Sequence, residues 1–159
     1  MAALVKHAND RDVWLQLRDR FPYPYTETDA RVFLEHLRHA DPLTHFAIEV
    51  DGEAAGGIGL DPQVDIHAIS AELGYWLGRA VWGRGIATAA VRALTGFVFE
   101  HDRWRRLFAG VFSTNPASMR VLEKVGYRRE GVFRQAVIKD GRVLDQIIYG
   151  LTREEWKGR

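Results

Sequence analysis

The sequence predicts an α/β domain built on a mixed sheet, and three observations support this fold class. The dipeptides Asp51-Gly52 and Asp140-Gly141 each separate two segments of alternating apolar and polar residues, which is typical of β-hairpins. Apolar residues recur at helical spacing over residues 85–100, and another helix is expected over 115–126. Because hairpins pair antiparallel and helical crossovers pair parallel, the sheet should be mostly antiparallel with one parallel step near its middle.

The expected elements follow one another in the order α-α-β-β-β-α-β-α-β-β. The first helix covers residues 2–20 with a break near Asn9-Asp10, and the segment 21–25 ends it because its prolines cannot continue a helix. The strands are expected at residues 44–50, 54–60, 69–77, 106–113, 132–138 and 143–151.

For two of the helices the pattern also predicts which side chains face the core. Thr26 or Thr28 caps the second helix, which runs to about His39. Its inward residues should be Val32, Phe33 and Leu37. The long helix at 85–100 should turn these residues inward: Ile86, Ala90, Leu94 and either Phe97 or Val98.

Composition limits the possible functions. A chain of 159 residues with 47% hydrophobic and 27% charged residues suits one domain over residues 1–159. The net charge of +1 provides no strong field for nucleic acid or an anionic membrane. No apolar run approaches the about 20 residues that span a bilayer, and no signal peptide is recognisable, so we expect a cytoplasmic protein.

Thiol chemistry and metal binding are not expected. The chain has no cysteine, which excludes disulfides and thiolate catalysis. The six histidines form no HExxH motif, and His36 with His39 lacks a third ligand, so no metal site is predicted.

The most informative segment lies between the third strand and the long helix. The first turn of this helix has no acidic residue and no clear Ser, Asp or Asn cap, so its first N–H groups lack partners. Two glycines allow a close backbone approach, and Arg84 adds a cation. This combination suits a pyrophosphate, although a glycine-rich turn capped by water would look similar. The segment reads Trp82-Gly83-Arg84-Gly85-Ile86-Ala87-Thr88.

This segment resembles motif A of the GNAT acetyltransferase family, R/Q-x-x-G-x-G/A. Gly85 and Ala87 match the pattern, and Trp82 stands where Arg or Gln is usual. The stretches 71–78 and 81–83 look like the RimJ/RimL type of this family, in which Trp is usual at that position.

The resemblance implies a GNAT fold whose central parallel strands splay apart and whose co-substrate is acetyl-CoA, with no metal. The backbone near Leu77 would pair with the pantetheine arm. The coenzyme-binding residues of this segment would be Leu77, Trp82, Gly83, Arg84, Gly85, Ala87 and Thr88.

The segment 113–127 resembles motif B of the same family, N-x-x-S-x-x-x-x-E-K-x-G-[FY]. Asn115 is an N-cap, Pro116 takes the first helical position and Gly126 ends the helix. The resemblance implies that Asn115 also faces the coenzyme. It also implies that Ser118 bonds the thioester sulfur or protonates the departing thiolate, whereas a purely local role would be to assist the cap. The tyrosine acid of many GNAT enzymes is replaced by Leu122.

Glu72 is the predicted general base. It alternates with Gly74 and Trp76 on one face of the strand that should border the thioester slot. An exposed strand glutamate without a catalytic role is the alternative, with ordered water acting as the base. His67 and Asp145 are the next candidates.

The predicted activity is acetyl transfer to a primary amine, at a protein N-terminus or on a small molecule, by direct transfer in a ternary complex. The alternatives are a catalytically weak acyl-CoA sensor and a structural domain. The segment 21–25 and the final hairpin would line the acceptor pocket, or 21–25 would staple two helices. Val137 replaces a carboxylate expected in some ribosomal-protein acetylators. Related chains begin with a strand that is expected to be missing here, and the new sheet edge would allow a monomer or a homodimer.

Overall fold

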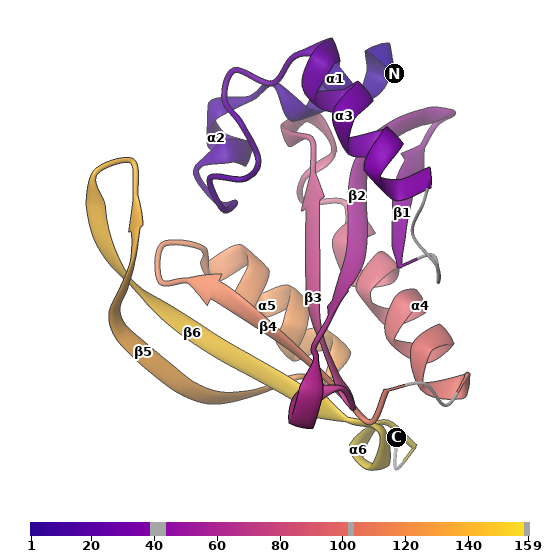
Figure 1. The fold of residues 1–159 in the computed structure, drawn as a ribbon, viewed down its shortest axis with the longest axis vertical. Helices are drawn as coiled ribbons and strands as arrows, with labels where there is room; N and C mark the ends of the chain where they lie inside the picture. The colour runs from indigo at the N-terminus through magenta and orange to yellow at the C-terminus, as the bar shows by residue number, and fades with distance from the viewer. Residues whose placement is uncertain (39–43, 102–103, 158–159) are drawn as a thin grey trace. The chain divides into compact units, whose positions relative to one another are not determined.

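The computed structural model describes residues 1–38, 44–101 and 104–157. Its six strands form one sheet in the order β1-β2-β3-β4-β6-β5 (Figure 1). The strands are β1 (His45–Val50), β2 (Glu53–Pro62), β3 (Ser70–Leu77), β4 (Arg106–Phe112), β5 (Arg128–Lys139) and β6 (Arg142–Thr152). The helices are α1 (Ala2–Ala8), α2 (Arg11–Trp14), α3 (Glu27–Arg38), α4 (Ile86–Glu100), α5 (Pro116–Val125) and α6 (Arg153–Lys157), with 3-10 turns η1 (Asp65–His67) and η2 (Arg79–Val81). The predicted α/β class and the mixed sheet are confirmed.

The chain divides into two compact units. Unit 1 comprises Met1–Gly59 and Tyr75–Ile86, and unit 2 comprises Leu60–Gly74 and Ala87–Arg159. Unit 1 thus holds the three N-terminal helices, β1, most of β2, the end of β3 and the turn before α4. Unit 2 holds the first part of β3, the strands β4 to β6, nearly all of α4, and the helices α5 and α6.

In unit 1 the expected helix over residues 2–20 is wrong in its second half. The break near Asn9 is confirmed, because the Asp10 carboxylate accepts the N–H groups of Asp12 and Val13 and caps α2. Helix α2 then ends at Trp14. The chain beyond it tightens into turns, in which Gln16 and Leu17 donate to carbonyls only three residues back.

Helix α3 begins as predicted but presents a different face. Thr26 and Asp29 form a reciprocal cap, with the Asp29 carboxylate 2.8 Å from the Thr26 amide. The expectation that Val32 and Phe33 point inward is wrong, since they are 66% and 41% exposed. The fully buried residue of this helix is Ala30, which clusters with Ala8 of α1 and Tyr25, so small side chains make the contact between the helices. The predicted end at His39 lies outside the described residues.

The hairpin β1–β2 turns as the sequence predicts. Asp51 and Gly52 both adopt positive φ, at 52° and 82°, which matches the two-residue turn that Asp-Gly favours. Val50 pairs with Glu53 across this turn. The second predicted turn, Asp140-Gly141 in unit 2, has φ values of 49° and 72°.

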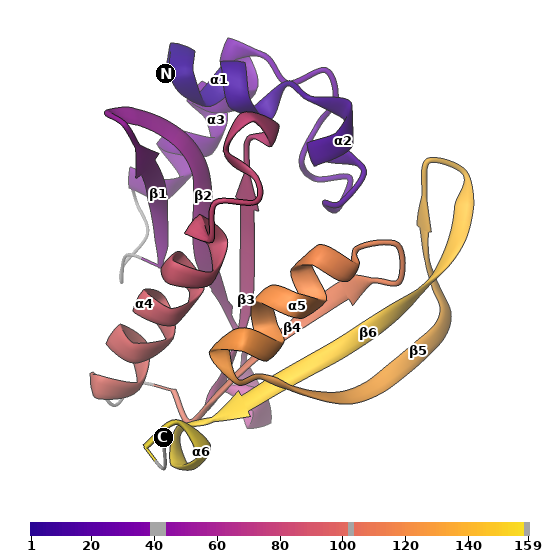
Figure 2. The same cartoon turned by 180° about the vertical axis from the view of Figure 1, so that it is seen from behind.

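Unit 2 contains a long antiparallel ladder. Strand β6 pairs with β4 on one side and with β5 on the other. Helix α5 lies across β4 and β6 (Figure 2). Helix α4 buries Leu94 and Val98, whereas Phe97 is 51% exposed and Ile86 and Ala90 are only half-buried. The predicted inward face is therefore confirmed for Leu94 and Val98. The Thr95 hydroxyl of α4 lies 2.9 Å from the phenol of Tyr127 in the buried interior of the unit.

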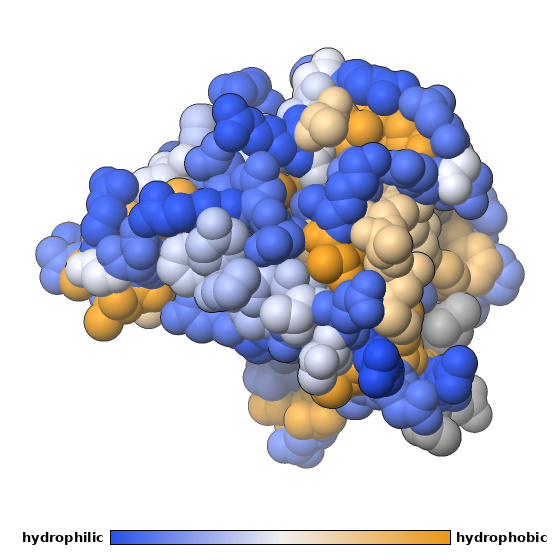
Figure 3. Space-filling view, turned by 90° about the horizontal axis from the view of Figure 1, so that it is seen from above, coloured by the Kyte–Doolittle hydropathy of each residue, from blue (hydrophilic) through white to orange (hydrophobic). Residues whose placement is uncertain are grey.

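Apolar residues are exposed at several places on the surface. On the face drawn in Figure 3, hydrophilic residues predominate and apolar residues lie among them. Exposed apolar residues of this kind are ordinary on a globular protein. Within the described part of the chain, no helix is both long and apolar enough to cross a membrane.

Candidate functional site

The turn between β3 and α4 is held open by two glycines. Gly83 and Gly85 adopt φ values of 76° and 78°, a region that L side chains rarely occupy. A Cβ added at either glycine would meet no atom within 4 Å, so the backbone at both positions borders open space. A ligand can therefore approach this backbone closely.

The start of α4 matches the electrostatics predicted for an anion site. The helix begins at Ile86, and its first turn contains no acidic residue. The first N–H groups of any α-helix, including here those of Ala87 and Thr88, have no partner within the helix. The positive end of the helix dipole is thus not neutralised by a carboxylate of its own first turn.

Trp82 anchors this turn to the end of β3. Its indole nitrogen donates a 2.8 Å hydrogen bond to the carbonyl oxygen of Leu77. The next amide, Gly78 N–H, donates to the Ala55 carbonyl oxygen of β2 at 2.8 Å. The sequence suggested a ligand contact for Trp82, and the structure adds a positioning role that nothing in the sequence pattern indicated.

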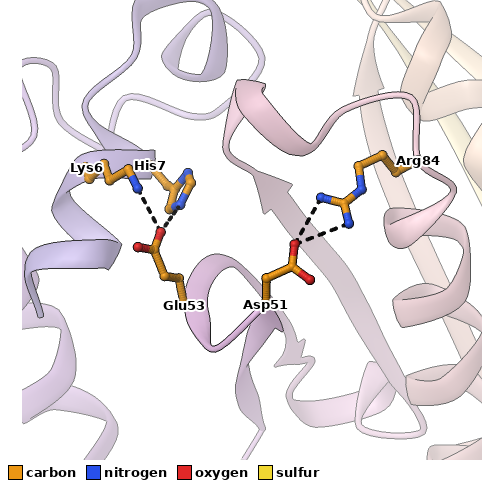
Figure 4. A network of polar contacts seen from close by, with 5 residues as sticks. All are labelled: Lys6, His7, Asp51, Glu53 and Arg84. Carbon is orange, nitrogen blue, oxygen red and sulfur yellow. Dashed lines mark hydrogen bonds and ion pairs between the residues drawn. The ribbon is translucent and has the colours of Figure 1, made fainter.

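Arg84 lies beside a carboxylate from a distant part of the chain. Its guanidinium nitrogens are 3.4 Å and 3.5 Å from an Asp51 oxygen at the tip of the β1–β2 hairpin (Figure 4). Two residues further on, Glu53 accepts from Lys6 at 2.8 Å and lies 3.2 Å from His7. Hydrogen bonds from Lys6 and then from His7 hold the pKa of Glu53 below its usual value.

The start of α5 is capped by a side chain of its own segment, unlike the start of α4. The Asn115 side-chain oxygen accepts the Ser118 amide N–H at 3.0 Å, which confirms the predicted N-cap. Gly126 ends the helix with a φ of 110°, and its N–H donates to the carbonyls of Leu122 and Glu123. Because the cap uses the backbone of Ser118, the capping bond does not depend on the serine hydroxyl.

Glu72 lies where the parallel strand pair stops pairing. The register of β3 with β4 runs from Ser70–Arg106 to Glu72–Phe108. Both strands continue past this point, β3 to Leu77 and β4 to Phe112. Within unit 2, Glu72 is half-buried and alternates with the buried Ala71 and Leu73, as period-two strand geometry requires.

The two other candidate bases have different surroundings. His67 is exposed in η1, before β3. The Asp145 carboxylate accepts the Gln135 amide N–H at 2.8 Å, and Gln135 has a φ of 51° within an irregular stretch of β5. Asp145 therefore stabilises the β5 bulge. Val137 pairs with Leu144 and brings no carboxylate to this strand.

A buried tyrosine in unit 2 bonds to a residue of the second motif, a contact that the sequence did not predict. The Tyr149 hydroxyl donates a 2.7 Å hydrogen bond to Glu123 of α5. Burial, this hydrogen bond and the adjacent negative charge raise the pKa of Tyr149 to about 12. Glu123 belongs to the E-K-x-G part of the second motif, but its partner is 26 residues away, so no local pattern could reveal the pair. Leu122, at the position of the missing tyrosine acid, is fully buried core.

The aromatic segment 21–25 is divided between packing and surface. Phe21 stacks on Tyr25 at 4.9 Å and meets Trp76 edge-on at 5.3 Å. Tyr25 is 5% exposed, whereas Tyr23 is 44% exposed. The interhelical staple is therefore confirmed for Phe21 and Tyr25, and Tyr23 is the tyrosine of this segment that faces outward.

Metal chemistry gains no support from the described residues. No group of three potential His, Cys, Asp or Glu ligands gathers anywhere in the described ranges. His39, which could share a helix face with His36, lies outside these ranges.

Comparison with known proteins decides the family. The family model described as "Acetyltransferase (GNAT) domain" matches residues 1–128. The chain belongs to the GNAT acetyltransferase family. Its relatives include YdaF of Bacillus subtilis (strain 168), 33% identical over 108 residues that make up 68% of this chain and 58% of YdaF. This chain therefore spans little more than half the length of that relative.

Two further GNAT proteins bear on the type. The "[Ribosomal protein uS5]-alanine N-acetyltransferase" of Escherichia coli (strain K12) is 26% identical over 84 residues, 53% of this chain and 43% of that protein. The structure of Mycobacterium smegmatis RimJ "in complex with CoA-disulfide" superposes with a TM-score of 0.79 at 27% identity and covers 96% of this chain and 76% of that one. The RimJ/RimL-like resemblance found in the sequence is confirmed at the level of family and fold.

Proposed function

We propose that this chain transfers the acetyl group of acetyl-CoA to a primary amine by direct attack in a ternary complex. One observation carries the proposal. In a GNAT chain, two glycines at the α4 start adopt positive φ and leave open space where a Cβ would lie. Such a turn suits an extended pyrophosphate, which needs close contact with backbone N–H groups.

Each part of the coenzyme has a fitting set of residues. The N–H groups from Gly83 to Thr88 would hold the pyrophosphate, and Arg84 would add a positive charge. The backbone near Leu77 would bind the pantetheine arm, within a turn that Trp82 ties in place. The co-substrate supplies an acyl group activated as a thioester. Asn115, as the fixed cap of α5, would face the same molecule.

We propose that two side chains of unit 2, Glu72 and Ser118, transfer protons. Glu72 would accept a proton from the amine, directly or through one water, because it lies at the last paired position of the parallel strands. Ser118 would donate a proton to the departing thiolate, from a helix start that its neighbour Asn115 fixes.

The acceptor class we favour is the α-amine of a protein or peptide. Support comes from the Escherichia coli relative, whose name gives an alanine of ribosomal protein uS5 as its substrate. The outward-facing Tyr23 is an apolar surface that a peptide could contact. Small-molecule amines remain the competing acceptors, to be ranked by experiment.

A sensor of acyl-CoA is the second candidate, and one observation favours it. Leu122 fills the position of the family's tyrosine acid and is fully buried, so this helix carries no phenol for the leaving thiolate. A sensor would bind the coenzyme and release no thiol in the presence of amines.

Binding and turnover distinguish these candidates. At 100 times its Kd, acetyl-CoA should stabilise the fold by about 2.7 kcal/mol, measured by thermal or urea unfolding. An acceptor panel of N-terminal peptides, polyamines and amino sugars is then followed by thiol release and by product mass. Binding with no thiol release from any acceptor supports the sensor, and no binding at millimolar acetyl-CoA contradicts both.

A further inference from the structure

Asp51 is the feature of the turn region that the proposed function does not use. It lies at the tip of the β1–β2 hairpin, and its carboxylate lies 3.4 Å from the Arg84 guanidinium (Figure 4). Arg84 stands between two glycines that leave the backbone open to a ligand. The Arg84 side chain, which we expect to contact a phosphate, thus already lies next to the Asp51 carboxylate of the same chain.

We propose that Asp51 sets the affinity of the α4 turn by competing with the ligand's phosphates for Arg84. The proposal rests on the proposed function, since it assumes that a coenzyme A-type ligand binds at this turn. In the ligand-free chain Asp51 neutralises the guanidinium. A phosphate-bearing ligand must displace this carboxylate before it gains the full attraction of Arg84.

The geometry of the pair favours competition over permanent anchoring. The nitrogen–oxygen separations of 3.4 Å and 3.5 Å are long for a charge-assisted hydrogen bond. The Arg84 side chain is 50% exposed and the Asp51 side chain 80% exposed. Exposed pairs of this kind contribute little, so a multiply charged phosphate can replace the carboxylate.

The neighbouring charges make Asp51 specific for this role. Glu53, on the same hairpin, is already held by Lys6 and His7. Arg79, at the other end of the turn, pairs with Asp12 of α2 at 2.7 Å. Of the two arginine pairs, the Arg84 pair is the longer one and the one flanked by positive-φ glycines.

Asp51→Asn removes the charge with little risk to the fold. Asn tolerates positive φ, and Asn-Gly is a preferred dipeptide for this type of two-residue turn. Asp12→Asn is the matched control because it removes the same charge from the Arg79 pair of the same unit. Coenzyme A binding to each full-length variant is measured by calorimetry at low and at about 1 M salt.

We expect Asp51→Asn to tighten coenzyme A binding about two- to fivefold at low salt, the range that an exposed pair can supply. The gain should shrink at about 1 M salt, where screening is effective beyond about 3 Å. Asp12→Asn should leave the Kd unchanged. In an Arg84→Gln background, which we expect to bind more weakly by itself, Asp51→Asn should have no effect.

Three results would overturn the competition. Unchanged or weaker binding in Asp51→Asn would make Asp51 a clamp that holds Arg84 in place. An equal gain in Asp12→Asn, or a gain that persists in the Arg84→Gln background, would point to overall charge. If the unmodified chain does not bind coenzyme A at all, the proposed function itself fails.

Discussion

Helices α4 and α5 both follow a strand of the sheet through a tight turn, yet their first turns are built in opposite ways. At α5, Asn115 supplies an oxygen to the Ser118 amide. At α4, Gly83 and Gly85 supply no side chain, and no acid follows in the first turn. A helix start closed by its own residues is a fixed platform for a side chain, whereas an open start keeps its N–H groups for a ligand.

The first test fills the open start. Gly85→Asp places a carboxylate where we expect the pyrophosphate. It should weaken acetyl-CoA binding roughly 10²-fold or more, since about two charge-assisted hydrogen bonds worth about 1.5–3 kcal/mol each are lost. Calorimetry measures the Kd, and circular dichroism checks the fold.

Gly141→Asp is the control for this variant. Gly141 also has a positive φ, at 72°, and also borders open space, so it imposes comparable backbone strain. Normal affinity in Gly85→Asp, or equal losses in both variants, would show that the phosphate site lies elsewhere.

The second test leaves the closed start intact and removes only its hydroxyl. Ser118→Ala keeps the capping bond, which uses the backbone N–H. If Ser118 donates the proton to the thiolate, kcat should fall roughly 10²–10⁴-fold with little change in the Kd for acetyl-CoA. Ser113→Ala, an exposed serine two residues before the cap, should keep full turnover. Full turnover in Ser118→Ala would assign this residue a structural role.

The third test concerns the strand that leads into the open start. Glu72→Gln should lower turnover about 10²-fold at neutral pH and remove or move the acidic limb of the pH–rate profile. Coenzyme binding should persist because the shape of the side chain is kept. Glu49→Gln, on the exposed face of β1, removes a charge from another strand and should change neither quantity. An unaltered rate and pH profile in Glu72→Gln would favour ordered water or His67 as the base.

The smallest effect is expected from the bond that ties α5 to β6. Tyr149→Phe should lower the free energy of unfolding by about 1–2 kcal/mol at neutral pH, because the hydrogen bond to the exposed Glu123 is lost. The folded chain binds the phenolic proton more tightly than the unfolded chain. This stabilisation is therefore complete below about pH 10 and is lost as pH rises toward the folded pKa of about 12.

Urea unfolding from pH 8 to 12 follows the difference between the two proteins. The gap between the original chain and Tyr149→Phe should narrow across the upper part of this range. Tyr127→Phe removes a buried hydroxyl that is hydrogen-bonded to the neutral Thr95 hydroxyl. Its free energy of unfolding shows the cost of losing a hydrogen bond to an uncharged partner. A gap that stays constant to pH 12 would contradict the assigned role of Glu123.

Much of this molecule could be predicted from sequence because the deciding interactions are local. The cap at Asn115, the left-handed stop at Gly126 and the two Asp-Gly turns each depend on contacts within about four residues. The same holds for the glycines before α4, whose conformation only glycine adopts readily. The order of the strands, the fold class and the phosphate-binding hypothesis all followed from such features, whereas the short C-terminal helix α6 was not predicted.

Other features depended on partners far apart in the chain, which no local pattern encodes. Ala30 rather than Val32 or Phe33 is the buried residue of α3, because packing against α1 determines which face of α3 is buried. Tertiary structure also decided where β3 and β4 stop pairing, which fixes the position of Glu72. The Arg84–Asp51 and Tyr149–Glu123 pairs join residues 33 and 26 positions apart, and a charged or phenolic side chain alone does not specify which partner the folded chain will bring to it.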